Sequence, residues 1–176
     1  MNGIALENIM QFTVGKNPTR LKEQKVSEIY TSEDFDRNLY DMKNEQLLTG
    51  CIINLIKSKA APFTNMTDNK CITSNFLICL FDTSILDPWF FCYKFNESAE
   101  IRQQIDMYNQ GTTVSVKKLT IKNIGNLELM LPAINKQMLI GEIYKKSILQ
   151  KELLIRQTEN LSKMMLNIIS KIEEEI

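Results

Sequence analysis

Histidine is absent from this chain of 176 residues. Without histidine there is no Ser-His-Asp or Cys-His catalysis, no HExxH zinc site and no Cys/His zinc finger. An excess of charge of one sign is also missing, because 21 Lys and Arg side chains balance 21 Asp and Glu side chains. A neutral chain is not a uniformly basic nucleic-acid coat protein, although a local basic patch can still bind DNA.

Cysteines are few, and none of the four forms a CxxC pair, which disfavours a zinc site or a thioredoxin-like redox site. Cys51, Cys79 and Cys92 stand among apolar, strand-like residues. Free cysteine packs as a small hydrophobic side chain, so we interpret these residues as buried thiols in preference to a disulfide pair. We expect no bound metal and no cofactor in the chain itself.

Long hydrophobic runs are missing as well. No stretch approaches the roughly 18 apolar residues of a membrane span. The first residues, Met-Asn-Gly-Ile, lack the basic and apolar regions of a secretory signal. The expectation is therefore a cytoplasmic protein with no membrane partner.

Residues 1–134 combine strand-like and helix-like segments. The strand-like segments are rich in β-branched and aromatic residues and lie at 52–56, 75–81 and 112–116. Helices are predicted at 34–40, 88–95 and 97–108, with Asn96 or Ser98 capping the last of them. A helical turn at 119–124 precedes an apolar run at 127–131. We therefore predict an α+β fold whose first domain spans residues 1–134.

The last segment, residues 135–176, predicts one long amphipathic helix, because it contains no proline and a single glycine near its start. Its apolar residues recur in steps of three and four or their sums. One domain cannot cover a helix of this length, so we predict dimerisation or docking to a partner helix; packing on its own domain is the alternative. The expected dimerisation residues are Leu154, Leu161, Met164, Met165 and Ile168.

Two loops hold the local excesses of positive charge. Such loops can contact phosphates and base edges, and the alternative is that they are ordinary solvated loops. The first is no Walker A loop, because the GxxxxGK[ST] spacing is missing. The candidate DNA-binding residues are Lys16, Asn17, Thr19, Arg20 and Lys22 in the first loop and Lys57 and Lys59 in the second.

No pattern in the sequence indicates catalysis. The segment Asp87-Pro88-Trp89-Phe90 is similar to the [DN]PP[FY] motif of amino-methyltransferases, but Trp89 replaces the second proline and no glycine-rich cofactor loop precedes it. A helix start is the better interpretation, with Asp87 as the cap and Pro88 in the first turn. The acids at 33–36 match neither a calcium loop nor a nuclease motif.

The order of several segments resembles the type I restriction–modification specificity subunits. Gly111–Val116, Ile124–Pro132, Gln137 and Ile140–Ile143 are similar to the end of a target-recognition domain and the entry into a conserved helix. Upstream, residues 12–18, 53–61 and 73–76 resemble the opening and the middle of that domain, and residues 149–161 resemble the conserved coiled-coil region. The family's second proline and glutamate near Pro132 are replaced here by Ala133-Ile134-Asn135-Lys136.

The resemblance implies a half-length specificity subunit with one recognition domain and one helix. Such a subunit is non-catalytic, dimerises, reads a bipartite DNA site, and docks methyltransferase subunits that use S-adenosylmethionine, with a restriction subunit as a further partner. Pairing with a different half-subunit is the alternative to a homodimer. The rival interpretation is a coiled-coil interaction or assembly protein with a degenerate recognition domain and no DNA role.

Overall fold

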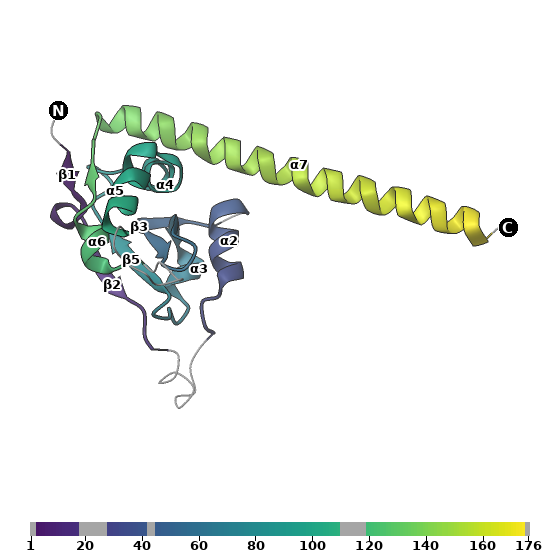
Figure 1. Ribbon diagram of the computed structural model, residues 1–176, viewed down its shortest axis with the longest axis horizontal. Coiled ribbons are helices and arrows are strands. Elements are labelled where there is room, and N and C mark those ends of the chain that lie inside the picture. Colours follow the sequence, from purple (N-terminus) through teal and green to yellow (C-terminus); the bar gives the residue numbers. More distant parts are fainter. Residues whose placement is uncertain (1–2, 18–27, 42–44, 110–118, 175–176) are drawn as a thin grey trace.

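A four-stranded antiparallel sheet forms the centre of the N-terminal region in the computed structural model, which describes residues 3–17, 28–41, 45–109 and 119–174 (Figure 1). The strand order is β2-β5-β3-β4. The strands span Gln11–Val14 (β2), Leu47–Asn54 (β3), Lys59–Thr64 (β4) and Phe76–Leu80 (β5). Successive residues Cys51, Ile52 and Ile53 of β3 are all fully buried. Because successive side chains of a strand point to opposite faces, both faces of the sheet are covered here.

Helices pack on this sheet and close the core. Helix α2 (Ser32–Tyr40) and helix α4 (Pro88–Glu97) both contact β4. Thr31 caps α2 in a capping box with Asp34, and Asp87 caps α4 with Pro88 in the first turn, so local sequence signals set both helix starts. The remaining short elements are the 3₁₀ helix η1 (Leu6–Asn8), α3 (Asn65–Asp68), α5 (Ala99–Asn109) and α6 (Ile121–Gly125).

A second, two-stranded sheet joins the two ends of the domain. Strand β1 (Ile4–Ala5) pairs antiparallel with β6 (Glu128–Leu129). The N-terminal strand therefore lies beside the chain just before the long helix starts (Figure 1).

Helix α7, Ile134–Glu174, is 41 residues long, which corresponds to roughly 60 Å. Its first half packs on α4, and its second half projects beyond the domain (Figure 1). Arg156 is partly buried and pairs with Asp41, just after α2, at 3.3 Å. Every residue from 157 to 174 is exposed. We call residues 157–174 the overhang.

The predicted α+β domain followed by a long C-terminal helix is confirmed. The helices expected at 34–40, 88–95 and 97–108 are present as α2, α4 and α5. Asn96 does not cap α5, because α4 continues to Glu97 and the Asn96 amide exchanges hydrogen bonds with the backbone of Ala60 at 2.7 and 2.9 Å. Ser98 stands between the two helices. The strand expected at 112–116 lies outside the described residues.

The cysteines are free thiols, as predicted, and Cys51, Cys79 and Cys92 are buried. Cys51 lies opposite Cys79 in the sheet, and its sulfur is 3.8 Å from that of Cys92 on α4. Burial raises the pKa of the Cys51 thiol well above its ordinary value. Across the described part of the chain, no helix has both the length and the apolar character required to span a membrane.

Candidate nucleic-acid interface and helix contacts

One end of the sheet brings together Lys16, Asn17 and Lys57, three of the residues that the sequence assigns to DNA. Strand β2 ends there, the β3–β4 turn lies there, and α2 begins beside it, on the side of the domain away from α7 (Figure 1). We call this region the loop end. Lys16 forms a parallel bridge with Thr73, and Ile29 forms one with Cys71. These bridges hold both ends of the segment 17–28 against the domain.

Lys16 and Asn17 are exposed at the loop end. The backbone of Lys16 is fixed, since its nitrogen donates to the Ile72 carbonyl at 2.7 Å and its carbonyl accepts from Ser74 at 2.9 Å. Gly15 permits this close approach, because a Cβ atom there would stand 2.1 Å from the carbonyl oxygen of Thr73. Thr19, Arg20 and Lys22, the other candidates in this loop, lie outside the described residues.

A cleft of about 320 Å³ opens between the start of α2 and the β3–β4 turn. Two apolar residues in its lining are accessible: Ile29 is 43% exposed and Ile56 is 60% exposed. Hydroxyl, amide and ammonium groups surround them; the lining includes Thr31, Ser32, Asn54, Lys57, Thr73 and Asn75. In the sequence, part of this polar lining is visible as the polar run Thr73-Ser74-Asn75. Polar composition alone did not identify its residues as functional.

Lys57 lies at the loop end, but it is not a free cation. Its Nζ contacts both carboxylate oxygens of Asp36 at 2.8 Å and stands 6.0 Å from the centre of the Phe35 ring. A further lysine, Lys70, binds Asp34 at 2.7 Å. Asp34 and Asp36 near the start of α2 therefore neutralise Lys70 and Lys57.

Lys59 is only two residues from Lys57 but belongs to a different surface. It starts β4 and lines a groove of about 480 Å³ between α2, β4 and α7. We call this the α2–α7 groove. Leu39, Tyr40, Ile148 and Ile155 give it apolar walls; Lys59, Glu97, Tyr144, Ser147, Lys151 and Glu152 are its polar lining. The structure thus separates two lysines that the sequence groups together.

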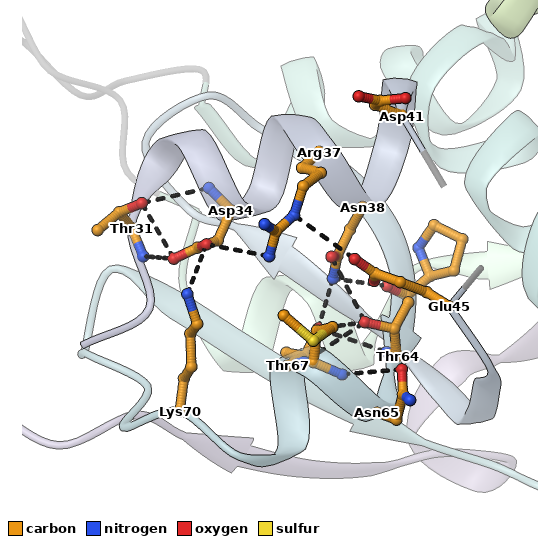
Figure 2. A network of polar contacts seen from close by, with 12 residues as sticks. Thr31, Asp34, Arg37, Asn38, Asp41, Glu45, Thr64, Asn65, Thr67 and Lys70 are labelled. Carbon is orange, nitrogen blue, oxygen red and sulfur yellow. Dashed lines mark hydrogen bonds and ion pairs between the residues drawn. The ribbon is translucent and has the colours of Figure 1, made fainter. Parts of the chain in front are cut away.

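A buried polar network fixes α2 against the sheet, as Figure 2 shows. The Asn38 amide donates to the Pro62 carbonyl at 3.2 Å and to Thr67, and the hydroxyls of Thr64 and Thr67 lie 3.1 Å apart. At the start of α2, burial acts to raise the pKa of Asp34, but hydrogen bonds from Lys70 and Thr31 outweigh it and hold the pKa below its ordinary value. These contacts place α2, and with it one wall of each of the two hollows.

The start of α7 is locked to α4 by two residues of the family resemblance. Gln137 is 1% exposed. Its Oε1 accepts from the backbone nitrogen of Asp87 at 3.1 Å, and its Nε2 donates to the carbonyls of Ile85 and Pro132 at 3.0 and 2.9 Å. One turn later, a Cβ atom at Gly141 would stand 2.3 Å from Asp87 Oδ1. This side of α7 is therefore built for the domain and is not free for another partner.

The five expected dimerisation residues all lie in the exposed second half of α7. Their exposed fractions run from 45% for Ile168 to 59% for Leu161. Leu154, Leu161, Met165, Ile168 and Ile172 recur in steps of three and four or their sum, which defines an apolar stripe along one side. Met164 lies to the side of this stripe, as do the exposed Leu153 and Leu166. The overhang is therefore apolar on more than one side.

The fold places the protein in a structural class, that of an α+β domain followed by a long projecting helix. Two solved structures share it. The HsdS subunit from Thermoanaerobacter tengcongensis matches with a TM-score of 0.52 and 11% identity, over 88% of this chain and 39% of that one. A chain from a structure of a type I R-M system, described for its complex assembly and conformational transition, matches with a TM-score of 0.57 and 13% identity, over 94% and 42%.

These matches confirm the sequence resemblance at the level of the fold, which is HsdS-like. This chain spans about two fifths of the length of the two proteins, 39% and 42%. No protein-family model matches the sequence, and no curated protein matches it.

Proposed function

We propose that this protein is a non-catalytic DNA-recognition subunit of a type I restriction–modification system. The observation that carries the proposal is the fold match, which runs through the domain and into α7 over 88–94% of the chain. The order of sequence motifs supports it independently, because Gln137 and Gly141, which carry the resemblance, also form the joint between domain and helix.

DNA binds at the loop end of the domain. Lys16, Asn17, Thr19, Arg20 and Lys22 contact the DNA from the first loop, and Lys57 does so from the β3–β4 turn. Arg20 and Asn17 have the side chains that pair bidentately with guanine and adenine, and the lysines suit phosphate. Lys59 is assigned to the α2–α7 groove instead, because it lines that groove. A neutral domain has few phosphate contacts, so its affinity alone is weak and a partner must supply the rest.

Dimerisation uses the overhang of α7. The apolar stripe from Leu154 to Ile172 has no cover among the described residues, and a second copy of the same helix covers it in a self-complementary way. In the dimer, α7 runs antiparallel to its copy and separates two recognition domains. A homodimer with two-fold symmetry then reads a palindromic bipartite site.

The chemistry belongs to partners. A methyltransferase subunit that uses S-adenosylmethionine docks on the dimer, and a restriction subunit joins that complex. Exposed apolar side chains also lie on both flanks of the stripe, Leu153 on one and Leu166 on the other, and they support further docking surface on the same helix, because exposed apolar surface marks interaction sites.

The deciding experiment is co-expression of this chain with the methyltransferase subunit of a type I restriction–modification system, followed by mapping of methylated positions. The expected result is methylation of a bipartite sequence that requires both proteins. Methylation that is unchanged when this chain is omitted would contradict the proposal. A dimer that binds the methyltransferase but leaves the DNA unmethylated would favour the rival, an assembly protein with no DNA role.

A further inference from the structure

The last described turn of α7 carries two adjacent acidic side chains. Glu173 and Glu174 occupy the last turn that the structure describes, and both are exposed. Within the described residues neither glutamate forms an ion pair. Their charge is therefore available to lysines of a partner chain.

The α2–α7 groove is lined by two lysines that can pair with these glutamates. Lys59 from β4 and Lys151 from α7 both line it, and neither has an ion-pair partner in the described part of the chain. The acids of the groove are engaged: Glu152 binds Arg156 at 3.1 Å, and Glu97 accepts from the Tyr144 hydroxyl at 3.2 Å. The groove is therefore able to take an acidic segment with some apolar character.

The apolar stripe indicates which residues of two copies lie opposite each other. If the helices run antiparallel with Leu154 opposite Ile172, then Leu161 lies opposite Met165 and Thr158 opposite Ile168. This register buries apolar residues at most positions of the stripe. In the same register Lys151 of one copy lies within one residue of a position opposite Glu174 of the other. A parallel arrangement would instead bring the acidic ends together.

The positions of the charged residues around the helix axis agree with this register. Lys151, Ile155, Ile169 and Glu173 share one side of α7, because they are spaced by four residues or by fourteen, which is close to four turns. A two-fold axis perpendicular to an antiparallel pair keeps equivalent sides of both helices on the same side of the pair. The partner's Ile169 and Glu173 therefore face toward the groove of the first copy, near Tyr40 at the end of α2.

We propose that the α2–α7 groove receives the acidic C-terminal end of α7 from a second, antiparallel copy of the chain. The inference rests on the proposed dimer and goes beyond it, because it makes the recognition domain part of the dimer interface. The dimer then has two equivalent contacts between a groove and a helix end, in addition to the contact between the two apolar stripes. The distance and angle between the two recognition domains are then fixed by the protein before DNA binds.

A charge-exchange experiment on the full chain tests the proposal by sedimentation. One variant carries Lys59→Glu and Lys151→Glu in the groove; the other carries Glu173→Lys and Glu174→Lys at the helix end. Each variant alone should self-associate at least about tenfold more weakly than wild type, because attraction becomes repulsion at both grooves. An equimolar mixture of the two should form mixed dimers with wild-type affinity, because opposite charges then meet at both grooves.

Loss of folding does not explain the expected result, because an unfolded variant would not form mixed dimers with wild-type affinity. The matched control is Lys122→Glu with Lys136→Glu, which changes the same charge away from the groove and should dimerise as wild type does. If wild type is a monomer, the proposed dimer fails and the groove contact with it. If wild type is a dimer and both variants dimerise equally well, or the mixture is no tighter than the variants alone, the groove inference is overturned while the dimer stands.

Discussion

The side chain of Gln137 accepts a hydrogen bond from the backbone nitrogen of Asp87 at 3.1 Å, so the first turn of α7 is tied to the residue that caps α4. The same amide satisfies two further backbone carbonyls. Asp87 also holds the start of α4, where its Oδ1 accepts from the Phe90 nitrogen at 2.7 Å. One aspartate and one glutamine thus join the first turn of α7 to the start of α4.

Replacement of this glutamine should destabilise the domain. Gln137→Ala leaves the Asp87 nitrogen and two carbonyls without their buried partner, which we expect to cost roughly 1–3 kcal/mol. Urea unfolding followed by circular dichroism measures the change. The control is the neighbouring exposed residue, Met138→Ala, which should shift stability by no more than about 0.5 kcal/mol. Equal stability of the two variants would show that the hydrogen bonds of Gln137 do not hold the joint.

The sequence predicted what local signals determine. Asp87 followed by Pro88 marked the start of α4, and the absence of proline with recurring apolar residues marked α7. Strand β4 was not predicted as a strand, because its residues Lys59–Thr64 contain Pro62 and two alanines and have little β propensity of their own. It is a strand because β3 pairs with it and helices α2 and α4 cover it.

The arrangement of the candidate residues could not be predicted from the sequence. Charge counting grouped Lys57 with Lys59, whereas the structure pairs Lys57 with Asp36 and turns Lys59 to the α2–α7 groove. Asp36 is distant in sequence, and the alternation of side chains at the start of β4 depends on where the β3–β4 turn ends. The Lys57–Asp36 pair and the orientation of Lys59 both depend on tertiary structure, so neither could be predicted from the local charge of the sequence.

The apolar stripe of α7 predicts the oligomeric state. Replacing Leu154, Leu161 and Met165 with Asp places charge in the dimer interface, so the dimer should become a monomer in light scattering. These residues are more than half exposed in the single chain, so the fold of the domain should survive. Leu139→Asp, exposed on α7 and outside the stripe, is the matched control and should remain dimeric. A wild-type chain that stays monomeric at high micromolar concentration would remove the basis of this prediction.

The ion pair between Asp34 and Lys70 predicts a dependence of stability on pH. The pKa of Asp34 is lowered in the folded state, because hydrogen bonds from Lys70 and Thr31 outweigh the effect of burial. The stabilisation is therefore present above the unfolded pKa of about 3.9 and is lost as the pH falls through the folded value. Asp34→Asn should be less stable than wild type at neutral pH, and the difference in urea midpoint should shrink in acid. A difference that does not change with pH would indicate loss of the capping contact alone.

The contact between Lys57 and Asp36 predicts a change in DNA affinity that a solvated lysine would not give. Lys57 is 39% exposed and Asp36 is 42% exposed. Surface ion pairs of this kind contribute roughly 0–1 kcal/mol to stability. A DNA phosphate can therefore displace the Asp36 carboxylate from Lys57. Asp36→Asn should therefore strengthen binding to all sequences alike, and Lys57→Ala should weaken it and reduce the salt slope by about one. Arg20→Ala, by contrast, should cost about 1–3 kcal/mol on the cognate site and relax the choice of base at one position.

The measurement is a titration of each complex with the methyltransferase against cognate and scrambled DNA at two salt concentrations. Asp68→Asn removes the same charge from the domain without touching a candidate DNA residue, so it separates a local effect of Asp36 from a change in net charge. If Asp36→Asn and Asp68→Asn strengthen binding equally, the effect is one of overall charge and Lys57 is not at the interface. If Arg20→Ala and Lys57→Ala both bind cognate DNA as tightly as wild type, DNA binds to another face of the domain, and the loop end loses its assignment while the fold match stands.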